Sequence, residues 1–217
     1  MFPTSLGSVN LDLLITSEAD YVSISNSQYN KRIVTLSHAI EVICFDSVAE
    51  WKRDSDFPIE SSKGWIVRIT KTAATKELLA VSCVLTKLSD EVKGYSDSGE
   101  HLDAVWIEDQ KHVVSIGTED GEMLKYRAER SDWMPARFAA QLGCYHTREE
   151  SFTKYLETGF QTQIPELLQG EKLYFHYLVA TNPKNRSKGY PDEDDISTNF
   201  AVDFPKWTLL KKLSLEE

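Results

Sequence analysis

The sequence predicts an α+β fold: a single domain built mainly on an antiparallel β-sheet, with two consecutive helices near 134–160 packed on one face. Short runs rich in β-branched and aromatic residues recur from residue 9 to residue 117, which is typical of strands. Helix-forming segments come late, and a continuous apolar run follows them at 172–180. Strands followed by late helices favour helices laid on one face of a sheet.

The composition supports a folded chain with a complete core. Of 217 residues, 41% are hydrophobic and 11% are aromatic, and the charges are of both signs. These values lie far from those of disordered chains. Because no low-complexity linker and no repeat of solenoid length divides the chain, we expect one domain over 1–217.

The first quarter of the chain predicts four short strands, at 9–15, 21–25, 32–36 and 39–45. A polar turn separates the first two. A brief helix is expected after Ser47, because the spacing of Ser47 and Glu50 is that of a capping box.

The next region has the clearest strand pattern. We expect strands at 64–71 and 76–88, and in the second strand one face is apolar. That face consists of Leu79, Val81, Cys83 and Leu85. The polar residues 89–100 predict a surface loop.

A three-stranded meander is predicted next, with strands at 101–109, 112–117 and 122–129. Asp120-Gly121 precedes the third strand. This dipeptide is a strong hairpin signal, because glycine tolerates the positive φ of a tight turn.

The two expected helices come after residue 130. The first covers 134–143, with proline near its start and glycine at its end. The second begins at Thr147, which has capping-box spacing to Glu150. Its apolar face would consist of Phe152, Tyr155 and Leu156. A short helical turn is expected at 165–169.

The run 172–180 predicts a strand in the middle of a sheet, with both faces covered. A long loop at 182–195 and a final strand at 199–204 would follow.

Charge and targeting patterns exclude several functions. The net charge of -10 and the lack of a basic stretch argue against nucleic acid as a partner. The N-terminus has no basic region before its apolar residues, and no run approaches the ~18 apolar residues of a membrane span. Three widely spaced cysteines indicate neither a disulfide framework nor a zinc finger. We therefore expect a cytoplasmic protein that does not bind a membrane.

No catalytic signature is present in the sequence. It contains no Gly-rich phosphate loop, no G-x-S-x-G, no H-E-x-x-H and no C-x-x-C, so no cofactor is expected. Acids and histidines gather around one predicted hairpin, but without an established ligand spacing, so no metal is expected. These residues are His101, Asp103, Glu108, Asp109 and His112.

Two histidines leave an enzyme open as an alternative. His176 lies in the central strand among aromatic residues and would share a face with Tyr174 and Leu178. His146 follows Cys144 closely. Either histidine, together with a carboxylate, could act in a hydrolase or transferase, provided that a deep pocket reaches it.

Acidic side chains are concentrated in two segments. Residues 88–109 hold seven acids against one base, and residues 192–195 are all acidic. Aromatic side chains nearby could supply binding energy while the charge steers a basic partner. The leading hypothesis is a protein-binding module, most concretely an immunity-type inhibitor of a basic toxin or nuclease. Its predicted contact residues are Glu100, Asp103, Trp106, Tyr190, Asp192, Asp194 and Asp195.

A third possibility is a structural or assembly subunit. This would be favoured by an exposed apolar patch larger than a few hundred Å².

Overall fold

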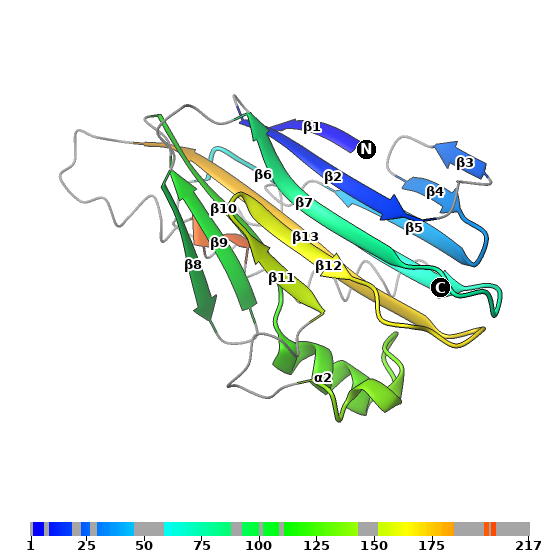
Figure 1. Cartoon of the computed structure of the whole chain (residues 1–217). Helices are drawn as coiled ribbons and strands as arrows, with labels where there is room; N and C mark the ends of the chain where they lie inside the picture. Colours follow the sequence, from blue (N-terminus) through cyan, green and yellow to red (C-terminus); the bar gives the residue numbers. More distant parts are fainter. Residues whose placement is uncertain are drawn as a thin grey trace.

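The strands of this computed structural model form two antiparallel sheets, which Figure 1 shows stacked on each other. The structure describes residues 2–6, 9–18, 23–26, 30–45, 59–87, 93–99, 102–108, 111–142, 152–184, 198–199 and 201–202.

The smaller sheet has five strands in the order β1-β2-β7-β12-β11. Their bounds are β1 Phe2–Leu6, β2 Val9–Ser17, β7 Leu79–Lys87, β12 Gly159–Gln163 and β11 Thr153–Leu156. The larger sheet has eight strands in the order β3-β4-β5-β6-β13-β10-β9-β8. Their bounds are β3 Ser23–Asn26, β4 Asn30–Val34, β5 His38–Phe45, β6 Ser61–Lys71, β13 Lys172–Pro183, β10 His112–Glu119, β9 Leu102–Glu108 and β8 Lys93–Gly99.

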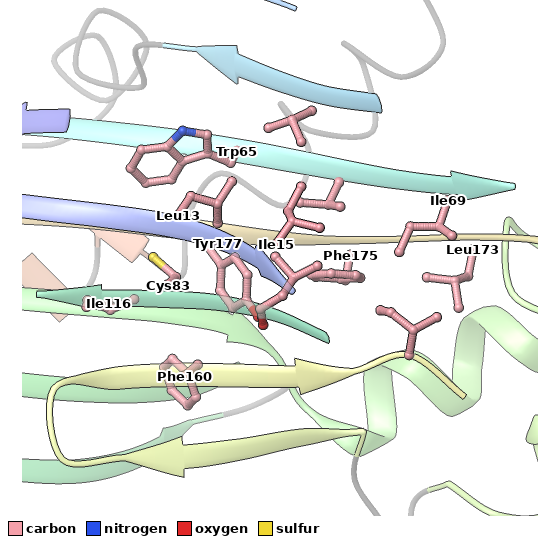
Figure 2. Close-up of a cluster of buried hydrophobic side chains, with 14 of the residues drawn as sticks. Leu13, Ile15, Trp65, Ile69, Cys83, Ile116, Phe160, Leu173, Phe175 and Tyr177 are labelled. Atoms are coloured by element: carbon pink, nitrogen blue, oxygen red, sulfur yellow. The ribbon is translucent and has the colours of Figure 1, made fainter. Parts of the chain in front are cut away.

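The main hydrophobic core fills the space between the two sheets. Alternation along β2 and β7 sends every second residue inward, so that Leu13 and Cys83 lie opposite each other in the register. Figure 2 shows these two side chains facing Trp65, Phe175 and Tyr177 of the larger sheet. The apolar face predicted for 76–88 is therefore confirmed.

Strand β13 lies in the middle of the larger sheet, between β6 and β10. Its residues from 173 to 182 are all buried. Phe175 and Tyr177 face the other sheet, whereas Tyr174 and Leu178 face the opposite side. The central strand and the face shared by Tyr174, His176 and Leu178 are confirmed.

The side of the larger sheet that faces away from the smaller sheet is also covered; we call it the outer face. Ala201 and Val202 pack there with Leu178. The Ser115 hydroxyl lies 2.8 Å from Thr198 Oγ1 and 2.7 Å from Asn199 Oδ1. These four residues of the C-terminal segment (198–199 and 201–202) are helical, so the final strand predicted at 199–204 is wrong. They cover the sheet face instead of extending an edge.

The third strand of the predicted meander is wrong, because residues Gly121–Glu129 form helix α2. The Asp120 carboxylate accepts a hydrogen bond from the backbone N–H of Met123 at 2.8 Å. This is an N-cap, and it satisfies an otherwise unpaired amide in the first helical turn. The first two strands of the meander are confirmed as β9 and β10.

The two consecutive helices predicted near 134–160 are also wrong. Within 134–142 only the 3₁₀ turn η1, Ala136–Phe138, is helical, and β11 and β12 form a hairpin where the second helix was expected. Tyr155 packs against Phe160 across this hairpin, with ring centroids 5.0 Å apart. Residues 143–151 lie outside the described residues. The helical turn predicted at 165–169 is not helical either.

Other predictions have mixed outcomes. The surface loop predicted at 89–100 is wrong in its second half, because β8 pairs with β9 along its whole length. Strands near 9–15, 21–25, 32–36 and 39–45 are present, although the first two belong to different sheets. The loop predicted at 182–195 is wrong at its start, because β13 extends to Pro183, and its residues from 185 onward lie outside the described residues. The helix predicted after Ser47 also lies outside them. The mainly antiparallel fold is thus confirmed, and the single domain over 1–217 stays a prediction.

Candidate functional site

The described residues of the predicted contact surface, Asp103 and Trp106, both lie on β9. Trp106 lies opposite Ser115 in the register, so its side chain projects on the outer face, as does that of Glu108. The Glu108 carboxylate forms an ion pair with the Lys184 ammonium, and the Lys184 N–H donates to the Lys111 carbonyl at 2.6 Å. The chain therefore enters the segment from residue 185 onward beside the C-terminal end of β9.

Asp103 points to the other side of β9. Its carboxylate accepts a hydrogen bond from the Tyr155 hydroxyl of the smaller sheet at 2.6 Å. The structure therefore does not bring Asp103 and Trp106 onto one face. The other predicted contact residues lie outside the described residues; they are Glu100, Tyr190, Asp192, Asp194 and Asp195.

His176 does lie near a carboxylate, as the enzyme alternative requires. Its Nδ1 is 3.5 Å from Glu119 Oε2, and both side chains are almost fully buried. The same carboxylate accepts two hydrogen bonds of 2.8 Å from Nη1 of Arg127, which is also buried. The guanidinium in turn lies 3.4 Å from the ring centroid of Tyr174.

Charge pairing explains how Glu119 stays ionised in the interior. Burial alone would raise its pKa, but Arg127 and His176 outweigh burial and lower the pKa below its usual value. A compensated buried pair of this kind is expected to be structural, because removing one partner leaves an uncompensated charge.

The hollow next to Glu119 is too small for a substrate. It measures about 10 Å³, which is room for roughly one water molecule. It is lined by Leu124, Phe152 and Phe175 among others, and His176 is not in its lining. His146 and Cys144 of the alternative dyad lie outside the described residues.

Metal ligands do not converge in the described part of the chain. No group of three or more His, Cys, Asp or Glu residues there could hold a metal ion. Glu108 pairs with Lys184, and Asp103 pairs with Tyr155. His101 and Asp109 lie outside the described residues.

A polar cluster that the sequence did not predict surrounds Glu77, in the loop from β6 to β7. The Glu77 carboxylate accepts hydrogen bonds from the Ser17 hydroxyl, from Thr35 Oγ1 at 2.8 Å and from the Ser37 backbone N–H at 3.2 Å. It also lies 2.5 Å from Ser37 Oγ and 3.0 Å from His38 Nδ1. Burial would raise the pKa of Glu77, but these hydrogen bonds lower it to about 2.

The Glu77 cluster contains serine, histidine and glutamate but does not have the geometry of a catalytic triad. In a triad the serine and the acid bind opposite nitrogens of the imidazole. Here Ser37 Oγ and Glu77 both contact Nδ1 of His38, at 3.2 Å and 3.0 Å. Ser37 is also fully buried, and burial lowers the pKa of His38 despite Glu77. The cluster therefore joins loops and lacks the arrangement of a catalytic triad.

Another hollow on the described surface lies beside Trp133. It is an open groove of about 540 Å³ between the turn after α2 and the start of β13. Its lining consists of Ser131, Trp133, Met134, Pro135, Ala136, Arg137, Glu171 and Lys172. We call it the Trp133 groove. Sequence analysis missed it, because 134–143 was interpreted as a regular helix.

Comparisons give no family for this chain. Protein-family models, curated proteins and solved structures were compared with it, and no significant match was found. Within the described residues, no helix has the length and apolar character to cross a bilayer.

Proposed function

We propose that the chain is a protein-binding module for a partner with a basic surface, most concretely an immunity-type inhibitor of a basic toxin or nuclease. The observation that carries this proposal is the Glu108–Lys184 ion pair. It ties the end of the first acidic segment to the residue from which the chain continues toward 192–195. Two acidic segments that are joined near this pair would present their charge to one partner and speed its association.

The contact surface that we propose is narrower than the sequence alone suggested. It includes Trp106 on the outer face, together with Glu100, Tyr190, Asp192, Asp194 and Asp195. Asp103 is not part of it, because its carboxylate already binds Tyr155 on the opposite side of β9.

Charge reversal tests the proposal. We would capture partners from extracts of the native cell, purify the basic protein that is expected, and measure its association kinetics. A triple variant Asp192→Lys, Asp194→Lys, Asp195→Lys should associate at least roughly tenfold more slowly and with a weaker salt dependence.

The matched control reverses three exposed acids elsewhere, with Glu18→Lys, Glu129→Lys and Glu157→Lys. This control carries the same net charge and should associate at close to the wild-type rate. Equal slowing by both variants, or capture of a partner without a basic surface, would contradict the proposal.

Exposed leucines favour an assembly subunit as a second candidate. Leu36, Leu78 and Leu168 are 62%, 48% and 61% exposed, on three loops at one end of the sheets. Hydrogen bonds connect these loops: Thr72 N–H donates to the Ser37 carbonyl at 2.8 Å, and Gly170 N–H donates to the Lys71 carbonyl at 2.8 Å. Exposed apolar side chains gathered at one end of the sheets suit an interaction surface.

This second candidate has its own test, the mass in solution. The variant Leu36→Asp, Leu78→Asp, Leu168→Asp should remain monomeric where the wild type forms a larger species in sedimentation experiments. If the wild type stays monomeric up to high concentration, the assembly subunit is contradicted, whereas the proposal of a protein-binding module is unaffected.

A further inference from the structure

The Trp133 groove is shaped by an unusual backbone. Ser131 and Trp133 have φ values of 53° and 46°, in the left-handed region that large side chains avoid. Such backbone conformations are strained and persist only where the surroundings hold them. Here the Trp133 carbonyl accepts hydrogen bonds from the Tyr174 N–H at 3.1 Å and from Arg127 Nη2 at 3.3 Å.

Two cations lie over the indole ring that this backbone holds in place. The Arg68 guanidinium carbon lies 5.3 Å from the ring centroid of Trp133, and the Lys172 ammonium lies 5.2 Å from it. Tyr174 meets the ring edge-on, at 6.4 Å between centroids. Cations above an aromatic face are attracted to it, so the ring and Lys172 are held as a unit at the wall of the groove.

Of the cations at this groove, Lys172 is the one available to a ligand. Arg68 pairs with Glu41 at 3.2 Å, and Arg137 makes hydrogen bonds of 2.9 Å and 2.7 Å to the Glu171 carboxylate. Lys172 is exposed, and none of the described carboxylates lies within ion-pair distance of its ammonium. Trp133, Met134, Pro135 and Ala136 supply an apolar lining beside this free charge.

We infer that the Trp133 groove binds a short peptide segment in which a carboxylate lies next to a large apolar side chain. The apolar side chain would pack on Trp133 and Pro135 while the carboxylate pairs with Lys172. The volume of about 540 Å³ is within the range of ligand clefts. An open groove cannot enclose most of a small molecule, so an extended segment lying across it suits the shape better.

This inference goes beyond the proposed function and does not depend on it. The groove lies at the Lys172 end of β13, whereas the Glu108–Lys184 pair lies past its other end, twelve residues away. The two surfaces also take ligands of opposite charge.

The test selects binders from a phage-displayed library of short random peptides on the whole protein. Enriched sequences should combine Asp or Glu with Phe, Leu or Trp. In fluorescence-polarisation titrations, synthetic versions should bind Lys172→Glu roughly tenfold or more weakly than wild type. Ala136→Arg, which fills the groove from an exposed position, should abolish binding.

Lys154→Glu is the matched control, because Lys154 is an exposed lysine on β11, outside the groove. It should bind the peptides like wild type, and far-UV circular dichroism should show all three variants folded. The inference is overturned if no peptide is enriched, if the enriched peptides are basic, or if both lysine variants bind them equally. None of these results bears on association with a basic partner through residues 192–195.

Discussion

Five donors converge on the carboxylate of Glu77, and they come from both sheets. The Ser17 hydroxyl belongs to β2 of the smaller sheet, whereas Ser37 lies in the β4–β5 connection of the larger sheet and His38 is the first residue of β5. Lys71 adds hydrogen bonds from its ammonium to Ser37 Oγ at 3.0 Å and to the Thr75 carbonyl at 2.7 Å. One carboxylate thus joins the loops at the end of the molecule where the exposed leucines lie.

Replacing Glu77 with glutamine should make stability less dependent on pH. The pKa of Glu77 falls from 4.5 to about 2 on folding, so the ionised group stabilises the fold above about pH 4.5 and this contribution is lost as the pH falls toward 2. The shift corresponds to at most roughly 3 kcal/mol of unfolding free energy at neutral pH, before solvent screening of the charge reduces it. Glu77→Gln should therefore have a lower urea midpoint at pH 7 and lose less stability on acidification.

The control for this measurement is Glu166→Gln, at a side chain that is 71% exposed. It should behave like wild type at every pH. An equal loss of stability between about pH 5 and about pH 3 in wild type and Glu77→Gln would contradict the role given to Glu77.

At the residue scale, the sequence predicts which face of a sheet a side chain lies on better than it predicts which residue that side chain contacts. Strand alternation correctly placed His176 with Tyr174 and Leu178, but it could not supply Glu119, which depends on how β10 pairs with β13. The Trp133 groove depends on two left-handed backbone positions, and nothing local in Ser131 or Trp133 requires them.

Among the elements, strands with strong alternation or continuous apolar character were predicted and helices were not. The dipeptide Asp-Gly is compatible both with a tight hairpin turn and with the start of a helix. At Asp120 it starts a helix. A helix is favoured here because its turns bring Leu124, Arg127 and Ala128 together as the buried face of α2. This spacing in the sequence is typical of a helix over 121–129.

In the β11–β12 hairpin the error is reversed, because the pattern predicts a helix and the structure has a pair of strands. Tyr155 and Leu156 have helical spacing to Phe152, but in the hairpin Leu156 is exposed and Tyr155 packs on Phe160. Pairing of β12 with β7 decides the structure, and that pairing joins residues about 80 positions apart. Local pattern cannot reveal such a contact.

Two glycines give a matched test of this hairpin. Gly159 has φ 153°, and a Cβ there would collide with the backbone carbonyl oxygen of Cys83 on β7. Gly170 has φ 86°, but a Cβ there would meet nothing within 4 Å. Gly159→Ala should lower the free energy of unfolding by about 3 kcal/mol, from strain and steric clash together.

Gly170→Ala isolates the backbone contribution and should cost about 1 kcal/mol. Urea denaturation of both variants measures the difference. Equal effects would mean that β12 does not approach β7 as closely as the structure shows.

Across the whole molecule, the two sheets are joined by a few polar bonds set within the apolar core. The Tyr177 hydroxyl, from the larger sheet, donates to the Val81 carbonyl of β7 at 3.0 Å and lies 2.5 Å from Thr162 Oγ1 of β12. Figure 2 shows Tyr177 between Cys83 and Phe175 in this core. Burial raises the pKa of this phenol far above its usual value, so the hydroxyl stays protonated and able to donate.

Tyr177→Phe should destabilise the whole sandwich by about 1 to 2 kcal/mol, because acceptors on the smaller sheet lose a buried donor. The urea midpoint should fall while the slope of the transition stays the same. Tyr126→Phe, at a residue 48% exposed on α2, is the control and should leave the midpoint unchanged. A Tyr177→Phe midpoint equal to that of wild type would show that this bond between the sheets contributes nothing.

The position of β13 in the strand order has a consequence for biosynthesis. It is the last of the described strands along the chain, yet it separates β6 from β10 in the larger sheet. While the polypeptide emerges from the ribosome, β3–β6 and β8–β10 are two fragments whose facing edges have no strand to pair with. The larger sheet can close only after residue 183 has left the exit tunnel, so a nascent chain must keep both edges from aggregating until β13 has been synthesised.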